Sequence, residues 1–337
     1  MIKILKEERK SKVLKPAGFG CFNDIPVINI TRGCSFYCVY CYANVYRGAP
    51  PKGTIHLYHN LRELIKSELD SPRRKNPKPL YICFNTSSDC FQPEGEILQT
   101  TFDLMKFLLE RDIGISFLTK GYIPDEFIHL FSKRKDKVYV QIGLVSLEKS
   151  YQEIFEPGAA PPDQRIGNIK RLKDKGLQVE VRLDPIFPNM TDSEEVLSSL
   201  FNALFKVGIR EVSLSYLMMR PGIFYQMKRE LPLEMVNRIA GYFKKQKWSK
   251  IALSHKTKLL SRKKRIEGYT KALMIARRYR IEGHICACKN PDIETEVCTL
   301  SRKTFFEEFD KYKREQQLGF FDRREGSSLN TQNSPFL

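Results

Sequence analysis

The sequence is best interpreted from residues 25–42, which read IPVINITRGCSFYCVYCY. Residues 25–30 form the first apolar segment of the chain with strand character. This segment runs directly through Thr31-Arg32-Gly33 into Cys34, Cys38 and Cys41. The chain therefore begins its regular structure with a strand that ends in a loop carrying three cysteines.

Strand-like and helix-like segments alternate after this stretch. The expected strands are residues 25–30, 80–85, 114–119, 138–145, 178–183 and 211–216, and the expected helices are residues 96–110, 124–132, 165–175, 193–207 and about 233–245. Six βα units in a row predict a parallel sheet. A barrel fits better than an open dinucleotide-binding fold because no GxGxxG motif opens the first unit. We therefore predict an α/β fold, a partial (β/α)6 TIM-type barrel, over residues 25–225.

Residue types that carry chemistry lie in the loops that follow these strands. Cysteines follow the first strand, residues 86–90 follow the second, and the next three strands are followed by Lys120, Ser146 and Asp184. In a (β/α) barrel the active site is built from these loops. The placement supports the barrel and predicts one site at the carboxyl ends of the strands.

The chain has 337 residues, of which 42% are hydrophobic and 28% charged, an ordinary globular balance. Its net charge is +18, and the segment from Lys244 to Arg280 holds fourteen basic residues and one acidic residue. Such a local excess favours a polyphosphate partner, DNA above all, over a merely solvated basic surface. We expect Trp248, Tyr269 and Tyr279 to be interleaved with these charges.

The regular alternation is expected to stop near residue 225. The predicted organisation is therefore a basic N-terminal extension (1–24), the barrel (25–225), a basic and cysteine-containing region (226–314) and a disordered tail (315–337). No run of eighteen apolar residues suggests a membrane span. The N-terminus has no apolar stretch or cleavage site typical of a secretory signal, so we expect a cytoplasmic protein.

Nine cysteines are many for a cytoplasmic protein, where disulfides do not persist. Three thiolates at CxxxCxxC spacing can hold three irons of a cubane cluster and leave the fourth iron open. Zinc sites instead usually show paired CxxC spacing and four ligands. The spacing of Cys34, Cys38 and Cys41 therefore predicts an iron–sulfur cluster, with a zinc knuckle or buried thiols as the alternatives.

The motif after the first strand resembles that of the radical SAM superfamily. Cys38-Val39-Tyr40-Cys41-Tyr42 and residues 85–93 (NTSSDCFQP) further resemble the spore photoproduct lyase group. The resemblance implies a [4Fe–4S] cluster on Cys34, Cys38 and Cys41 that cleaves S-adenosylmethionine to a 5′-deoxyadenosyl radical. It also implies two sets of cofactor contacts: Thr86, Ser87, Ser88 and Asp89 at the methionine end, and Lys120, Ser146 and Arg182 as secondary contacts. A plain Asx or Ser turn is the alternative for Ser87 and Asp89.

The lyase resemblance also implies a substrate reaction. Its radical breaks the methylene bridge of a thymine dimer, a cysteine returns a hydrogen, and tyrosines relay the radical back to the cofactor. Tyr42 and Tyr40 match the relay positions, with packing around the cluster as the alternative. The family's donor cysteine has no match here, so Cys90 is the candidate, and Cys83 is expected to be a buried apolar residue. A reductant such as flavodoxin or ferredoxin is implied.

A second group of cysteines, Cys286, Cys288 and Cys298, follows the basic stretch. With Cys21 or His284 as a fourth ligand it could hold a second iron–sulfur cluster or zinc. The other interpretation is buried thiols near the barrel mouth, one of which could be a hydrogen donor.

The tail peptide Gln317-Leu318-Gly319-Phe320-Phe321 matches the motif by which bacterial repair proteins bind the sliding clamp. Docking of this tail on its own barrel is the alternative. Our overall prediction is a radical SAM enzyme acting on DNA lesions. The rivals are a radical SAM enzyme that modifies RNA or a protein, and a non-enzymatic iron–sulfur nucleic-acid-binding protein.

Overall fold

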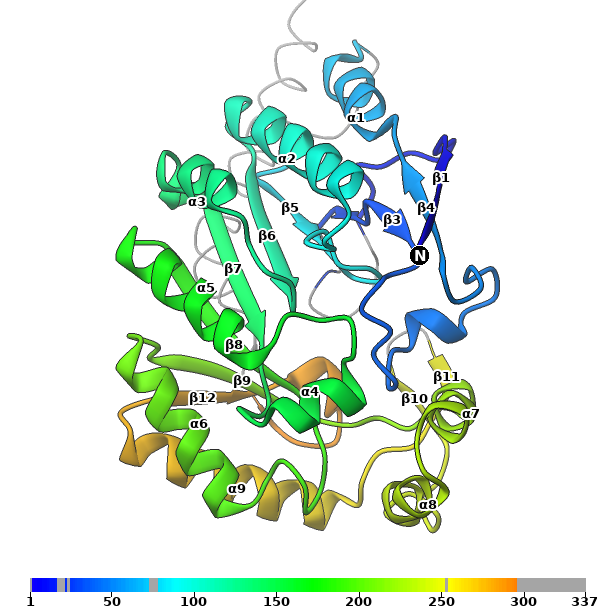
Figure 1. Cartoon of the computed structure of the whole chain (residues 1–337), viewed down its shortest axis with the longest axis vertical. Helices are drawn as coiled ribbons and strands as arrows, with labels where there is room; N and C mark the ends of the chain where they lie inside the picture. Colours follow the sequence, from blue (N-terminus) through cyan, green and yellow to red (C-terminus); the bar gives the residue numbers. More distant parts are fainter. Residues whose placement is uncertain (1, 17–21, 23–24, 73–77, 252–253, 296–337) are drawn as a thin grey trace, which may run out of the picture.

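The computed structural model describes residues 2–16, 22, 25–72, 78–251 and 254–295 (Figure 1). Its centre is a seven-stranded sheet in which all neighbouring strands are parallel. In spatial order the strands are β12 (Glu282–Ile285), β9 (Glu211–Tyr216), β8 (Gln178–Ile186), β7 (Val138–Gly143), β6 (Gly114–Thr119), β5 (Tyr81–Phe84) and β2 (Val27–Ile28). The two edge strands do not pair with each other among the described residues, so the barrel stays open. The predicted partial TIM-type barrel is confirmed.

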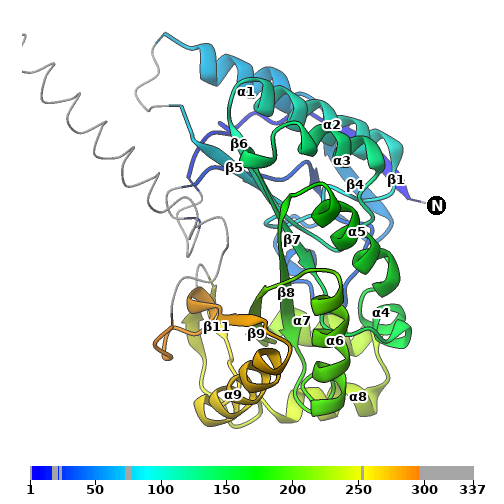
Figure 2. The ribbon, with the colours of Figure 1, turned by 90° about the vertical axis from the view of Figure 1, so that its left-hand side faces the viewer.

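Helices cover one side of this sheet (Figure 2). They are α2 (Gly95–Glu110), α3 (Asp125–Ser132), α5 (Pro162–Asp174) and α6 (Glu194–Lys206), all at positions that the sequence predicts. Each turns an apolar face to the sheet; in α2 the buried residues include Ile97, Leu104 and Leu108. Strands β5 and β6 are almost wholly buried, which is typical of parallel strands covered on both faces.

The first predicted strand is divided between two sheets. Only β2 stays in the barrel; two residues later the chain becomes β3 (Thr31–Arg32), which pairs antiparallel with β4 (Thr54–Tyr58). On its other side β4 pairs in parallel with β1 (Lys3–Glu7). The N-terminal segment thus contributes to a second, three-stranded sheet that flanks the loop after β3.

Beyond residue 225 the structure corrects the prediction that the alternation stops. Helix α9 (Arg262–Arg278) packs against α6, and β12 then adds to the sheet beside β9. Strand β12 reads EGHI and has no apolar run, so periodicity did not reveal it. Its Gly283 lies so close to α9 that a Cβ there would come within 2.4 Å of Leu273. The sheet therefore has seven strands, one more than expected.

The other elements connect or cap the barrel. They are α1 (Leu61–Asp70), α4 (Lys149–Phe155), α7 (Pro221–Glu230), α8 (Leu233–Gly241), the 3-10 turns η2 (Ala43–Val45), η3 (Lys135–Lys137) and η4 (Ala287–Lys289), and the hairpin of β10 (Ser249–Ile251) and β11 (Ser254–Thr257). In the described part of the chain, every helix is too short or too polar to cross a lipid bilayer.

Candidate active site

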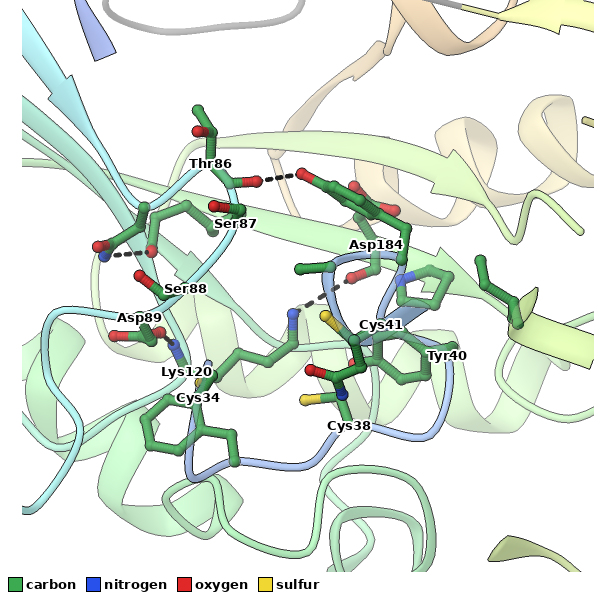
Figure 3. Close-up of a pocket in the computed structure, with 18 of the residues that line it drawn as sticks. Cys34, Cys38, Tyr40, Cys41, Thr86, Ser87, Ser88, Asp89, Lys120 and Asp184 are labelled. Carbon is green, nitrogen blue, oxygen red and sulfur yellow. Dashed lines mark hydrogen bonds between the residues drawn. The ribbon is translucent and has the colours of Figure 1, made fainter. Parts of the chain in front are cut away.

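The three cysteines lie on the loop of residues 33–42, here called the cysteine loop (Figure 3). Side chains between the cysteines, Phe36 and Val39, are each 3% exposed and anchor the loop in the core. Backbone hydrogen bonds to the end of α4 and to the segment after it also hold the loop: Val39 N donates to Phe155 O at 3.0 Å, and Gly158 N donates to Phe36 O at 3.0 Å. The apolar anchors leave the three thiols facing a cavity.

Two glycines allow the close contacts of this loop. Gly33 has φ +93°, and a Cβ there would lie 2.7 Å from Pro50 Cγ. Gly158 is more demanding, because a Cβ would lie 2.0 Å from the backbone oxygen of Ser35. Such a contact with backbone cannot be relieved by a side-chain rotation, so residue 158 must be glycine for the loop to lie where it does.

The loop of residues 86–89, here called the 86–89 loop, follows β5 and is fastened by Asn29. Asn29 Nδ2 donates to Thr86 Oγ1 at 3.0 Å, and Asn29 Oδ1 accepts from Ser87 N at 2.7 Å. The preceding Asn85 has φ +69°, a conformation that asparagine tolerates better than most residues. Together these contacts turn the 86–89 loop toward the cavity of the cysteines.

The buried carboxylate of Asp89 connects the loop after β5 to the end of β6 through hydrogen bonds. Its Oδ1 accepts from Phe91 N at 2.9 Å and Thr119 Oγ1 at 2.8 Å, and its Oδ2 accepts from Lys120 N at 3.0 Å. Burial raises the pKa of this carboxyl, although the three hydrogen bonds act in the opposite direction. Asp89 therefore holds two loops together, as the Asx-turn interpretation expects, while it also lines the cavity.

Lys120 extends from the end of β6 across the cavity floor (Figure 3). Its Nζ lies 3.5 Å from the carbonyl oxygen of Asp184 and 5.8 Å from the centre of the Tyr40 ring. Gly143, at the end of β7, makes room for it, because a Cβ there would lie 2.9 Å from Lys120 Cγ. The absence of a side chain at Gly143 of β7 therefore leaves the space that the Lys120 side chain, which follows β6, occupies.

The opposite wall is an ion-pair network centred on Asp184. Lys289 Nζ contacts its two carboxylate oxygens at 2.7 and 2.5 Å, and Arg182 Nε donates to Oδ2 at 3.0 Å. Burial of Asp184 favours the neutral acid, but Lys289 and Arg182 outweigh it and hold the pKa of Asp184 well below its usual range. Because Lys289 follows β12, this pair joins the last described strand of the barrel to β8.

The two tyrosines of the cysteine loop both line the cavity, and both hydroxyls have acceptors. Tyr40 donates to the carboxylate of Glu156, which forms a buried 2.6 Å ion pair with Arg165. Tyr42 donates to the backbone oxygen of Thr86. Tyr42 thereby ties the cysteine loop to the 86–89 loop, and Tyr40 ties it to the segment after α4.

A family model for the radical SAM superfamily matches residues 28–200, just over half of the chain. The chain belongs to the radical SAM superfamily. Membership implies a [4Fe–4S] cluster and S-adenosylmethionine. The residues that line the cavity can be compared with what these two groups need.

Solved structures of spore photoproduct lyase share the fold of this radical SAM protein. A mutant of that enzyme has a TM-score of 0.66 at 16% identity, covering 84% of this chain and 81% of that chain. Its complex with dinucleoside spore photoproduct has a TM-score of 0.65 at 15% identity, with the same coverage. At these identities the likeness establishes the fold.

Curated relatives are similarly distant. An uncharacterized protein of Acidianus two-tailed virus is 24% identical over 196 residues, 55% of this chain. An uncharacterized protein of Methanocaldococcus jannaschii is 25% identical over 175 residues, 51% of this chain. The match spans 64% of the length of each of these two relatives. The radical SAM Nα-GlyT isomerase of Pseudomonas phage M6 is 24% identical over 58% of this chain and 40% of that protein.

The cavity fits the two groups that the superfamily implies. Its lining combines the three thiols with buried polar atoms that have no hydrogen-bond partner among the described residues: Asn85 Oδ1, Ser88 Oγ and Arg220 Nε. These atoms include acceptors for an ammonium group and donors for a carboxylate or ribose. Burial raises the pKa of all three thiols, so a bound metal is needed to favour the thiolate form.

The structure brings most of the predicted site residues to this cavity. Its lining includes Cys34, Cys38, Tyr40, Cys41, Tyr42, Thr86, Ser87, Ser88, Asp89 and Lys120. Ser146 lies outside the lining and accepts from Glu148 N at 3.0 Å, as a serine turn before α4 does. Arg182 also lies outside the lining and acts through Asp184. Neither residue lines this cavity, and their contacts with the cofactor stay predictions.

Cys90 does not reach the cavity. Its side chain is fully buried in the main core, where Asn85 Nδ2 donates to its sulfur at 3.1 Å. The reason is the turn at Asp89, which directs the following residues into the core. Cys83 is 7% exposed and packs in a small apolar cluster, and burial raises its pKa to about 11. Among the described residues that line the cavity, the thiols are those of the cysteine loop.

The second cysteine group is only partly described. Cys286 Sγ and Cys288 Sγ lie 3.3 Å apart, and Arg182 Nη2 donates to Cys286 Sγ at 3.3 Å. Cys298, Cys21 and the peptide from Gln317 to Phe321 lie outside the described residues. The described residues that come together as potential metal ligands are instead His284, Glu211 and Glu282. The comparisons lend no support to a second cluster or zinc.

Three cavity residues were missed at the sequence level. Asn85 was visible as the residue before the Thr-Ser-Ser-Asp segment, but it looked like the end of a strand. Arg220 lies far from any motif. Lys289 directly follows Cys288 of the second cysteine group, but only the return of β12 to the sheet brings it beside Asp184. A lysine that follows a polar strand carries no local signal of this kind.

Proposed function

We propose that this radical SAM enzyme acts on lesions in DNA, as a repair enzyme of the photoproduct lyase type. The observation that carries the proposal is a cavity lined both by three thiols and by three buried polar atoms that lack a hydrogen-bond partner in the described part of the chain. A cofactor and a nucleotide-sized substrate group would both be held there, at the carboxyl ends of the strands.

The residues of the chain would bind and orient the cluster and S-adenosylmethionine, and would shield them from water. Cys34, Cys38 and Cys41 would hold the cluster, and Ser88 and Asn85 would bind the methionine end of S-adenosylmethionine. When the cluster is reduced, the cluster and S-adenosylmethionine together would supply a 5′-deoxyadenosyl radical that abstracts a hydrogen atom. Apolar neighbours such as Phe36 exclude water from the thiols.

DNA as substrate is supported by charge and by the neighbours. One solved structure of spore photoproduct lyase contains dinucleoside spore photoproduct together with AdoMet. In the Lys244 to Arg280 region, Lys263 has an 88% exposed side chain and Trp248 is 52% exposed. Arg265 and Tyr269 are buried and hold α9 to the barrel, so only part of this region is available to a partner.

A second candidate is a radical modification or rearrangement of a nucleotide that consumes S-adenosylmethionine. It is favoured by the position of Cys90, because a lyase of the spore photoproduct type needs a thiol that returns a hydrogen atom to the product. The similarity to the Nα-GlyT isomerase of a phage is consistent with it. Recruitment through the sliding clamp and reduction by flavodoxin or ferredoxin are proposals for either candidate.

The test uses anaerobically reconstituted protein, S-adenosylmethionine, dithionite and ultraviolet-irradiated DNA, with Cys41→Ala as the control. Each photoproduct and 5′-deoxyadenosine are measured by mass spectrometry. Loss of one photoproduct with return of thymine, in the wild type alone, supports repair. Formation of 5′-deoxyadenosine with every photoproduct untouched rejects repair and leaves the second candidate.

A further inference from the structure

A second, larger cavity opens beside the active site. It measures about 930 Å³ and is built from the three-stranded sheet of β1, β3 and β4 together with the segment around η2. These elements lie together in blue at the right of Figure 1. The two cavities share the lining residues Ala43, Asn44 and Ser87. The second cavity, here called the side groove, therefore lies directly beside the site of the three thiols, with these residues as the shared wall.

The side groove is rich in cations. Its lining contains the basic residues Lys6, Arg9, Lys10, Arg32 and Arg47 and the acidic residues Glu7 and Glu8. Glu7 is neutralised within the wall, since Arg32 Nη2 and His56 Nδ1 each lie 2.8 Å from its Oε2. Glu8 is exposed, and it is the one carboxylate in this lining that has no ion pair among the described residues.

Two of the cations are free to meet an anion. In the described part of the chain, neither Lys10 nor Arg47 forms an ion pair or hydrogen bond, and both are exposed. Lys6 is paired with Glu96 at 3.0 Å on the outer surface. Arg9 lies 5.9 Å from the centre of the Tyr58 ring. The side groove thus has two exposed cations that could bind the charges of a flexible polyanion, whereas its other cations already have partners.

An aromatic pair lies between the two cavities. Tyr42 lines the active-site cavity and Tyr46 lines the side groove, and their rings meet edge to face with centroids 5.5 Å apart. Tyr46 is 50% exposed, so one face of its ring is available to a ligand in the side groove. An exposed ring beside free cations is the combination that binds single-stranded nucleic acid, because bases stack on the ring and phosphates meet the cations.

We propose that the side groove binds a single-stranded stretch of nucleic acid next to the nucleotide that enters the active site. Lys10 and Arg47 contact the phosphodiester backbone, and Tyr46 stacks on the base that flanks the reacting one. The inference rests on the proposed function in one respect, that the substrate is a nucleotide within a strand. It adds a path for that strand beside the three-stranded sheet, lined by residues outside the basic region of Lys244 to Arg280.

The experiment measures fluorescence anisotropy of labelled single-stranded DNA and RNA, each about 12 nucleotides long, against the reconstituted full chain. The test variant is the double charge reversal Lys10→Glu with Arg47→Glu. We expect affinity for at least one of the strands to fall about tenfold or more, and its salt dependence to weaken. Two controls each reverse one exposed lysine elsewhere, half the charge change of the test variant: Lys170→Glu on α5 and Lys263→Glu on α9.

Equal affinity of the test variant and of Lys170→Glu for the single strands contradicts the proposed role of the side groove, whatever the lesion assay shows. Loss of affinity in Lys263→Glu alone overturns it as well, but leaves the proposed DNA substrate standing. Binding of a duplex with no binding of either single strand also overturns it. Groove-dependent binding of RNA alone supports the groove and contradicts the proposed action on DNA.

The aromatic part has its own measurement. A strand with 2-aminopurine reports stacking through quenching of its fluorescence. Tyr46→Ala is expected to lose the quenching and Tyr46→Phe to keep it, because stacking needs the ring and not the hydroxyl. Since Tyr46 is half exposed, neither change threatens the fold. Quenching that is unchanged in Tyr46→Ala overturns the stacking role.

Discussion

Two walls of the active-site cavity each contain a buried aspartate, but the two are held in opposite ways. On the first wall, Asp89 accepts hydrogen bonds from neutral donors of two neighbouring loops, and burial raises its pKa. On the second wall, Asp184 is clamped by Lys289 and Arg182, and its pKa is lowered. The first wall is built by neutral hydrogen bonds and the second by charge.

The difference follows from where the partners lie in the chain. The first wall joins loops that follow adjacent strands, β5 and β6, so short backbone bonds suffice. The second wall joins β8 to a strand more than a hundred residues later, with long side chains that bridge the distance. We infer that the first wall sets the position of the cysteines and cofactor, and that the second wall fastens the segment after β12 to β8.

The largest expected effect comes from moving the cysteine loop itself. Gly158→Ala places a methyl group against the backbone oxygen of Ser35 and must displace the loop. We expect iron bound per chain to fall by more than half, and formation of 5′-deoxyadenosine to fall tenfold or more. The matched control is Gly167→Ala in α5, where a Cβ meets nothing within 4 Å. Full iron content in Gly158→Ala would contradict this account of the loop.

Breaking the second wall should cost stability. Asp184→Asn leaves Lys289 and Arg182 without their carboxylate in a site where the side chains are 23% and 10% exposed. Loss of one partner of a buried pair costs about 3 kcal/mol, somewhat less here because Lys289 reaches water. Urea denaturation measures this loss in the free energy of unfolding. Adding Lys289→Met should recover part of the loss; a double variant no more stable than Asp184→Asn would show that the pair is not the cause.

The two walls should respond to pH with opposite signs. Asp184 has a folded pKa below its unfolded value, so its stabilisation is present above about pH 3.9 and is lost as pH falls toward the folded pKa. Asp89 has a folded pKa above its unfolded value, so its ionised form opposes folding at neutral pH and this penalty is removed as pH falls.

Urea denaturation between about pH 3 and 7 tests this contrast. As pH falls, the stability advantage of wild type over Asp184→Asn should shrink. The advantage of wild type over Asp89→Asn should grow as pH falls through the folded pKa of Asp89 toward the unfolded value of about 3.9. A change in the same direction for both variants would remove the distinction between the walls.

The smallest effect separates two serines that the sequence did not distinguish. Ser88 lines the cavity, and its hydroxyl has no hydrogen-bond partner among the residues that the structure describes, whereas the hydroxyl of Ser146 caps a turn outside the lining. Ser88→Ala should raise the concentration of S-adenosylmethionine needed for half-maximal 5′-deoxyadenosine formation several-fold. Ser146→Ala should leave it unchanged and lower stability by about 0.5–1 kcal/mol. The reverse pattern would restore Ser146 as a cofactor contact.

Much of the first wall could be predicted from the sequence because its signals are local. The cysteine spacing, the Thr-Ser-Ser-Asp segment and Lys120 each follow a strand with clear periodicity, and β6 and β9 have the bounds that the sequence predicts. The fold class followed from the same alternation, since strands and helices of ordinary length repeat through residue 216.

The second wall could not be predicted because its partners meet only in the folded chain. Strand β12 is short and polar, and α9 is hidden in a basic stretch that suggests a nucleic-acid surface. The position of Cys90 was equally invisible, since one residue decides whether a thiol after Asp89 faces the cavity or the core. Such choices depend on side-chain hydrogen bonds that composition and spacing do not report.

The most direct test compares the two groups of cysteines in one assay. Iron content and 5′-deoxyadenosine formation are measured anaerobically for Cys34→Ala, Cys38→Ala, Cys41→Ala, Cys286→Ala and Cys288→Ala. The account predicts that each of the first three loses both iron and product, and that the last two keep both. Loss of iron and product in Cys286→Ala or Cys288→Ala, equal to that in Cys41→Ala, would contradict it.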